Sequence, residues 1–255
     1  MKRFAHVEKL DALDPLRHLR NNDVDVDIVP AQPPSIINQT TQLVFPTSRL
    51  DLKNSHHAEA DMRTPEDIVI NLSVDASPGC GGIAWPAGEV LSRYLARRGS
   101  LRGRVALELG SGTGLVGLVA GILGADVWIT DQAPLLPIMT SNVALNGLSS
   151  RVRIAELNWG TPLPADLPAP DLVLAADCVY FEPAFPLLVG TLAELVPKEG
   201  KDVEVLFCYK KRRKADKRFF TLLKKEFTWT EVTDDPDHAV YSREAISLLR
   251  LTRRR

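Results

Sequence analysis

A glycine-rich loop and one carboxylate carry the most visible chemistry of this chain. A first apolar run, residues 105–109, leads into a loop that contains Gly110 and Gly112, and a second, residues 127–130, ends at Asp131. Glycines let the backbone turn with positive φ and approach a ligand closely, and a following helix N-terminus offers free N–H groups. A carboxylate at the end of the second strand can accept hydrogen bonds from both hydroxyls of a ribose. The pattern predicts a site for an adenosine-containing cofactor.

Two registers of the glycines favour different cofactors. Gly112, Gly114 and Gly117 fit the dinucleotide pattern G-x-G-x-x-G, with Asp131 about twenty residues further on, but this register begins beyond the end of the strand. The register that starts directly after the strand is the acidic-x-G-x-G-x-G form of residues 108–114. That form resembles motif I of S-adenosylmethionine-dependent methyltransferases with a seven-strand Rossmann-like fold.

This resemblance implies roles for the loop residues. Gly110, Ser111 and Gly112 would line the cofactor, and Glu108 would hold its methionine end through the amino group. Asp131 can bind the ribose and also cap the segment that follows it. A plain strand–helix turn, with glycines only for tight packing, is the alternative.

Length and composition are those of a globular protein with one sizeable α/β domain and an extension. The chain has 255 residues, is 45% apolar and 25% charged, and carries a net charge of −1, so nothing global indicates nucleic-acid binding. Its three cysteines form no C-x-x-C pair, which favours a reducing compartment and no metal site. No signal core or membrane-spanning stretch is apparent. We expect a cytoplasmic enzyme, monomeric and without membrane or direct nucleic-acid partners.

The chain divides into three predicted parts. Residues 1–35 are polar and predict a weakly ordered arm. Residues 36–78 contain two β-like runs, at 42–45 and 67–74, and predict a β-containing extension packed on the core. Residues 79–255 predict the methyltransferase domain. A local basic cluster, residues 210–214, is expected to be a solvated face or, second, a contact to an acidic partner.

Strands and helices alternate through this domain. Helices are predicted at 85–98, 115–124, 133–146, 184–196 and 213–224. Strands are predicted at 104–109, 126–130, 151–157, 171–176 and 203–208, followed by a pair at 226–232 and 246–251 with no helix between them. Such alternation predicts a mostly parallel, right-handed sheet with helices on both faces. The terminal pair predicts an antiparallel last strand, the ending of the Rossmann-like methyltransferase fold.

Further candidates follow the third and fourth strands, because ligands bind outside the carboxyl ends of an open α/β sheet. Trp159 can stack on an adenine, although it could simply seal the sheet edge. Asn158 beside it can hydrogen-bond the adenine amino group. Ala176 is small where the fourth strand passes the cofactor, which suits close approach.

Asp177 and Tyr180 are the candidates for chemistry. Methyl transfer requires the acceptor to be held against the methyl group with water excluded. A lysine amine has a pKa near 10.4 and must lose a proton before it attacks, and neighbouring oxygens can orient the amine and accept that proton. Asp177 and Tyr180 supply such oxygens; the alternative is a structural turn with a capping Asp and a packed Tyr.

The sequence here resembles the family 16 protein lysine methyltransferases. Asp177-Cys-Val-Tyr180 matches their D-x-x-Y motif, and further matches are Gly82-Ile-Ala-Trp85-Pro-Ala, Trp159-Gly160 and Tyr209-Lys-Lys-Arg212. The resemblance implies that Trp85, residues 110–112, Asp131, Trp159 and Ala176 line S-adenosylmethionine, and that Asp177 and Tyr180 face the acceptor. One departure is Asn158, where the family usually has Asp.

Within the family the chain is most similar to fungal enzymes that methylate a lysine of translation elongation factor 1A, which implies that protein as the substrate. Other hypotheses are a methyltransferase of another protein, a small molecule or nucleic acid, and a binding module that keeps the cofactor pocket without turnover. An adenine-N6 enzyme would want Pro-Pro and an aromatic residue after the acid of the fourth strand, where this chain has Cys178 and Val179. A nicotinamide oxidoreductase would leave Trp159 and Asp177 unexplained.

Overall fold

The computed structural model describes residues 38–47, 67–76 and 80–255. The arm predicted over residues 1–35 lies outside the described residues. Nine strands are present in the described part: β1 (Gln39–Phe45), β2 (Ile68–Val74), β3 (Val105–Leu109), β4 (Asp126–Asp131), β5 (Val152–Glu156), β6 (Leu172–Ala176), β7 (Glu204–Lys210), β8 (Phe227–Glu231) and β9 (Ile246–Arg253). The α-helices are α3 (Pro86–Arg98), α4 (Leu115–Ile122), α5 (Leu136–Leu145), α6 (Phe185–Leu195), α7 (Asp216–Glu226) and α8 (His238–Arg243).

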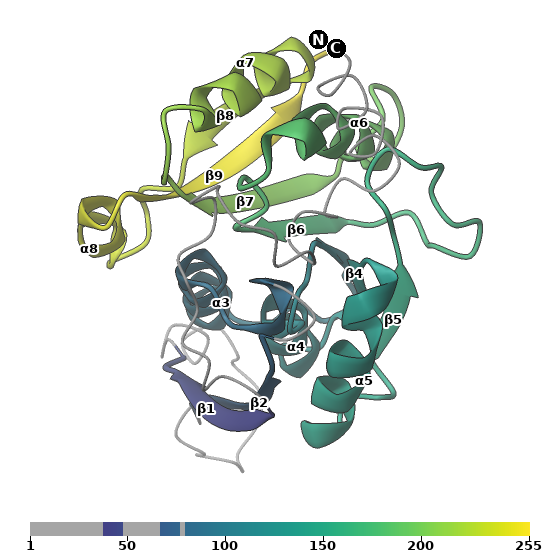
Figure 1. Ribbon diagram of the computed structural model, residues 1–255, viewed down its shortest axis with the longest axis vertical. Helices are drawn as coiled ribbons and strands as arrows, with labels where there is room; N and C mark the ends of the chain where they lie inside the picture. The colour runs from purple at the N-terminus through teal and green to yellow at the C-terminus, as the bar shows by residue number, and fades with distance from the viewer. Residues whose placement is uncertain (1–37, 48–66, 77–79) are drawn as a thin grey trace, which may run out of the picture.

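The main sheet has seven strands in the order β5-β4-β3-β6-β7-β9-β8 (Figure 1). The strands from β5 to β7 are parallel, whereas β9 inserts between β7 and β8 and is antiparallel to both. The chain order reverses between β3 and β6, where a ligand crevice forms in such sheets. The predicted fold class, a mostly parallel Rossmann-like sheet with an antiparallel last strand, is confirmed.

Two apolar clusters cover the two faces of the sheet. One contains Leu91 of α3, Leu118 of α4 and Met139 of α5, and the other contains Leu192 of α6 and Phe219 of α7. Helices α3, α4 and α5 therefore lie on one face, and α6 and α7 on the other. No helix in the described part of the chain is both long and apolar enough to cross a membrane.

The prediction that no helix separates the last two strands is wrong, because α8 lies between β8 and β9. This helix has only six residues, too few to show a helical period or to be stable alone. Tertiary contacts hold its start: the Arg97 guanidinium of α3 pairs with Asp235 at 2.8 Å and with Asp237 at 2.6 Å. Within the helix itself, Tyr241 is buried and anchors it to the core.

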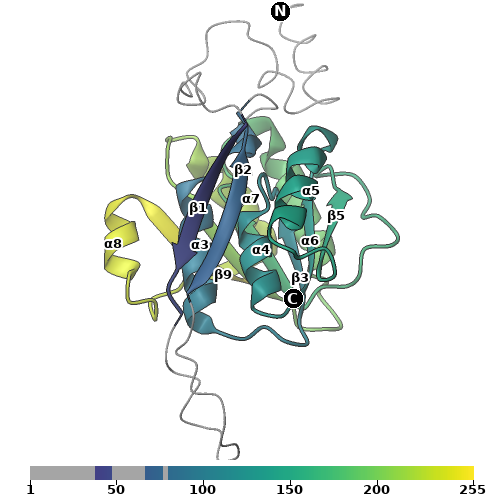
Figure 2. The ribbon, with the colours of Figure 1, turned by 90° about the horizontal axis from the view of Figure 1, so that it is seen from below.

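Strands β1 and β2 form a separate antiparallel hairpin. Ile68, Ile70, Leu72 and Val74 alternate along β2 and are buried, as the period-two pattern of the sequence predicts. They join the apolar cluster of α3, α4 and α5, and Figure 2 shows the hairpin lying across these helices. The extension thus shares its core with the helical layer of the main domain.

Two asparagines pair α5 and the turn after it with the open edge of β2. Asn146 accepts from the Asn71 N–H at 2.9 Å and donates to the Asn71 carbonyl at 2.8 Å. Asn142, one helical turn earlier, makes the same two bonds with Ser73 at 2.7 and 3.1 Å and also donates to the Thr113 carbonyl at 3.0 Å. Since Thr113 lies in the glycine loop, Asn142 connects the hairpin to the cofactor motif.

Asn142→Ala should lower the free energy of unfolding by about 2–3 kcal/mol, because it leaves part-buried backbone groups of Ser73 and the buried carbonyl of Thr113 without partners. Urea unfolding measures this change. Thr140→Ala, an exposed position on the same helix, is the control and should cost less than about 1 kcal/mol. Equal stability of the two variants would contradict a structural role for the Asn142 bridge.

Candidate active site

The candidate residues come together at one edge of the sheet. Strands β3, β4 and β6 are parallel neighbours, so their carboxyl ends at Leu109, Asp131 and Ala176 lie side by side. The loops that leave these ends carry the glycine motif and the D-x-x-Y segment. Parallel pairing therefore gathers groups that are far apart in the sequence.

Gly110 and Gly112, the first two of the three motif glycines, have positive φ and closely packed neighbours. Gly110 has φ +60°, and a Cβ there would lie 2.9 Å from the Trp159 ring and 3.1 Å from the Cys178 sulfur. Gly112 has φ +56°, and a Cβ there would lie 2.5 Å from the Gly81 carbonyl oxygen. Glycine is thus required at both positions by conformation and by space. The same contacts place Trp159 and the turn at residues 80–82 against the loop.

Glu108 is buried beneath the loop. Its Oε2 accepts a hydrogen bond from the Gly117 N–H of α4 at 2.9 Å, and its carbonyl accepts from the Thr130 hydroxyl at 2.7 Å. Burial raises the pKa of Glu108 to about 8, against the lowering effect of the hydrogen bond from Gly117. The carboxyl group therefore stabilises the start of α4 while one oxygen keeps capacity for a ligand.

Asp131 fixes the other side of the loop. Its Oδ2 accepts from the Gly112 N–H at 2.8 Å, and its Oδ1 accepts from the Gln132 N–H at 2.7 Å. Burial raises the pKa of Asp131 to about 6, while these two backbone N–H groups lower it. Each oxygen retains a lone pair with which it can accept a hydrogen bond from a ribose hydroxyl.

The residues after β5 and at the end of β6 lie beside the glycine loop and, with Glu108 and Asp131, form one side of the candidate site, called here the wall. Trp159 is half-buried and packs on the apolar cluster beneath α6, and Ala176 ends β6 opposite Cys208. Asn158 turns its amide nitrogen toward Glu156 at 2.8 Å, which leaves its amide oxygen as the acceptor. Although Asn158 stands where the family usually has Asp, its amide oxygen still provides a hydrogen-bond acceptor at this edge of the sheet.

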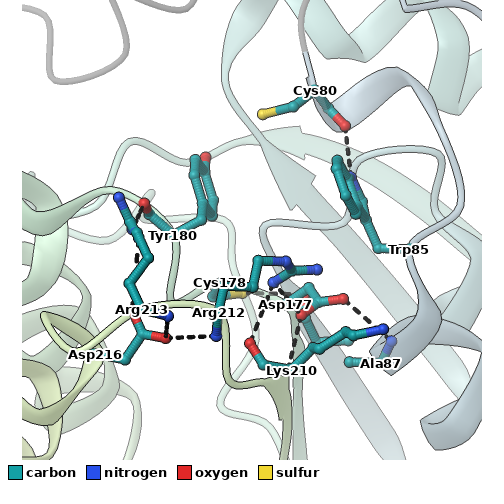
Figure 3. A network of polar contacts seen from close by, with 11 residues as sticks. Cys80, Trp85, Ala87, Asp177, Cys178, Tyr180, Lys210, Arg212, Arg213 and Asp216 are labelled. Atoms are coloured by element: carbon teal, nitrogen blue, oxygen red, sulfur yellow. Dashed lines mark hydrogen bonds and ion pairs between the residues drawn. The ribbon is translucent and has the colours of Figure 1, made fainter. Parts of the chain in front are cut away.

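Trp85 stands directly before α3. Its indole N–H donates to the Cys80 carbonyl at 2.6 Å, which fixes the ring against the turn at residues 80–82. In Figure 3 the Cys80 side chain lies above the Trp85 ring, with its sulfur directed toward the side on which Tyr180 lies. Burial, followed by the charge of Asp131, raises the pKa of the Cys80 thiol to about 11, so this thiol is neutral at physiological pH.

Asp177 is a buried carboxylate with three hydrogen-bond donors. Its Oδ2 accepts from the Ala87 N–H of α3 at 3.1 Å. Its Oδ1 accepts from the Lys210 N–H at 3.0 Å and from the Arg212 guanidinium at 2.8 Å. Asp177 has φ +54°, a left-handed conformation that is uncommon for a residue other than glycine. These bonds join the start of α3 and the end of β7 to the D-x-x-Y segment.

Two consecutive arginines hold this segment (Figure 3). The Arg212 guanidinium lies 5.0 Å from the Trp85 ring centre as well as against Asp177, and Arg213 donates to the Tyr180 carbonyl. Asp216 in turn accepts from the backbone N–H groups of both arginines at 2.9 and 3.0 Å. This turn delays the helix predicted at residues 213–224, which begins at Asp216.

The Tyr180 phenol makes no hydrogen bond to the described residues. Burial raises its pKa well above the ordinary value, so the phenol is neutral and can donate or accept through its hydroxyl. The sequence did not identify Cys80 or Arg212 as site residues. The match of residues 209–212 to the aromatic-basic segment was the available signal for Arg212; a lone cysteine carried none for Cys80.

The profile of the family described as lysine methyltransferase matches residues 64–226. The chain belongs to this family. The family and motif I identify S-adenosylmethionine as its cofactor. The chemistry of the donor set fits that cofactor, because Asp131 offers two acceptor oxygens, Trp159 an aromatic ring and Glu108 a carboxyl group.

Three relatives bear on the activity. Protein-lysine N-methyltransferase EFM6 of Saccharomyces cerevisiae is 41% identical over 203 residues, covering 69% of this chain and 82% of the relative. Protein N-lysine methyltransferase METTL21A of Danio rerio is 40% identical, covering 76% and 90%. EEF1A lysine methyltransferase 3 of Mus musculus is 40% identical over 136 residues, covering 52% and 59%. This chain is accordingly a protein-lysine methyltransferase.

The buried Glu108 predicts a pH dependence of stability. Its pKa in the folded protein is raised from 4.5 to about 8, so the folded state binds the proton more tightly than the unfolded state. The resulting stabilisation is complete below the unfolded pKa and is lost as pH rises through the folded pKa. We expect a loss on the order of 4–5 kcal/mol across this interval, since the pKa rises by about 3.5 and one pKa unit is about 1.4 kcal/mol.

Glu108→Gln keeps the shape but removes the ionisable group, and should flatten the part of this pH dependence above about pH 6 in urea unfolding curves. Below that pH the buried Asp131, whose pKa is raised to about 6, contributes in the same direction. Glu199→Gln, at an exposed position, should leave it unchanged. A pH dependence that survives above about pH 6 in Glu108→Gln would assign the effect to other groups.

Proposed function

We propose that this enzyme methylates a lysine of translation elongation factor 1A in the cytoplasm, acting as a monomer. The observation that carries this proposal is the 40% identity to a mouse protein named EEF1A lysine methyltransferase 3, together with the resemblance to fungal enzymes of that specificity. The protein substrate is in keeping with the family to which the chain belongs.

We assign the cofactor to the wall built by Trp85, Glu108, residues 110–112, Asp131, Asn158, Trp159 and Ala176. S-adenosylmethionine supplies an electrophilic methyl group when it is bound. Asp131 would accept the ribose hydroxyls and Trp159 would stack on the adenine. Trp159 and the turn at residues 80–82 pack against the loop, and methyl transfer requires that water be kept away from the methyl group.

We assign the acceptor side to Asp177 and Tyr180. The Tyr180 hydroxyl is available to orient the lysine amine, which must be neutral to act as a nucleophile. Asp177 already accepts three hydrogen bonds, so its contribution is to hold the site together and to provide negative charge beside the amine. The geometry therefore favours Tyr180 for direct contact and Asp177 for position and electrostatics.

The test is transfer of labelled methyl groups to purified elongation factor 1A and, in parallel, to a cell extract that lacks this enzyme. Label on a lysine of elongation factor 1A in both samples is the expected result. Label only on another protein would overturn the target but keep the activity. Cofactor binding in calorimetry without any protein label would favour the binding-module hypothesis.

Tyr180→Phe should lower kcat by roughly 10–100-fold, because it removes the hydroxyl that orients the amine, with little change in stability or cofactor affinity. Steady-state methylation assays and calorimetry measure kcat and the affinity. Tyr241→Phe, which loses a 3.4 Å bond to the Val232 carbonyl outside the site, is the matched control. An unchanged kcat in Tyr180→Phe would remove this hydroxyl from the mechanism.

Asp131→Ala should weaken cofactor binding by roughly 1–3 kcal/mol, because ribose hydroxyls and the Gly112 N–H lose their acceptor. Calorimetric titration with S-adenosylmethionine measures the affinity, and thermal unfolding monitors the fold. Asp126→Ala, at the exposed start of the same strand, should bind normally. Unchanged affinity in Asp131→Ala would exclude Asp131 from the cofactor site.

A further inference from the structure

Residues 210–218, which leave β7 and enter α7, are strongly basic. Seven of these nine residues are Lys or Arg, and Asp216 is the only acid among them, although the whole chain has a net charge of −1. The sequence left open whether this cluster is a solvated face or a contact to an acidic partner. Its position in the fold bears on that question.

The basic segment runs alongside the D-x-x-Y segment. The Lys210 N–H donates to Asp177 at 3.0 Å, Arg213 donates to the Tyr180 carbonyl, and Arg218 pairs with Glu182. These contacts follow one another in the same order along both segments. The basic residues therefore border the proposed acceptor site.

Five of the seven cations of this segment fall into two groups. Arg212 and Arg213 are directed inward, with side chains 20% and 27% exposed, and their bonds are used within the site. Lys211, Lys214 and Lys217 are exposed, and none of them forms an ion pair with the described residues. These three lysines, called here the basic rim, produce a positive potential without internal compensation.

We infer that the basic rim docks an acidic segment of the protein substrate next to the target lysine. This inference rests on the proposed acceptor site. Lysine ammonium groups attract carboxylates across an interface and steer their approach. Nucleic acid fits less well, because single strands require exposed aromatic faces for stacking, whereas Phe219 is buried and Phe220 packs between Tyr209 and Trp229 at 4.8 and 5.4 Å.

The test compares two charge-reversal variants of the full-length enzyme. The first carries Lys211→Glu, Lys214→Glu and Lys217→Glu. The second carries Lys224→Glu and Lys225→Glu, two exposed lysines in the last turn of α7, the helix whose first turn contains Lys217. Each is assayed at low and high salt for methylation of the protein that accepts the methyl label, and for binding of a fluorescent glutamate-rich peptide and of a fluorescent single-stranded RNA. The peptide measurement needs no turnover and so does not depend on which protein is methylated.

The rim variant should raise KM for the protein substrate by about tenfold, since exposed ion pairs are individually weak but act together, with kcat and cofactor affinity unchanged. It should also lose peptide binding and the salt dependence of KM, while the control variant retains both. Normal KM and peptide binding in the rim variant would overturn the inference. Loss of binding to a single-stranded RNA with normal KM would overturn it in favour of nucleic acid. Failure of elongation factor 1A as a substrate, with peptide binding lost only in the rim variant, would contradict the proposed target and leave the rim in place.

Discussion

The buried carboxylate of Asp177 is the constraint on which the site depends. It accepts hydrogen bonds from Ala87, Lys210 and Arg212, and so joins the start of α3, the end of β7 and the loop after it. A buried charge is costly unless it is paired and hydrogen-bonded, and here each requirement is met by a different segment. The same hydrogen bonds bring the start of α3 and Arg212 together. Trp85, which stands immediately before α3, therefore lies with its ring against the Arg212 guanidinium.

The cofactor side is organised by two further carboxyl groups. Glu108 and Asp131 each accept a backbone N–H, from Gly117 and Gly112 respectively, and burial raises the pKa of both. The protein thus uses both acids to shape the glycine loop, and under the proposed assignment the same acids present acceptors to the cofactor. Because the same atoms would then shape the loop and bind the cofactor, we expect substitutions at these positions to act on fold and affinity together.

The strand order follows from local patterns that the sequence shows clearly. Apolar runs alternate with helical segments up to β7, and that alternation leads to a parallel sheet with its ligand crevice at the carboxyl ends. The short α8 was not predicted, because it is stabilised by tertiary contacts, the ion pairs of Arg97 before its start and the burial of Tyr241, rather than by a helical pattern in its six residues. The same limit applies to Asn142 and Asn146, whose partners lie on a hairpin distant in sequence.

The sequence by itself determined the fold class, the glycine loop with Asp131 and the D-x-x-Y segment, because each is encoded by residue types at short spacing. Only the tertiary structure decided how the carboxylates are used. The three donors of Asp177, the inward arginines and the outward lysines of the basic rim come from segments separated by many residues. Such contacts depend on which strands lie side by side and on which way each side chain points, and local sequence patterns carry neither.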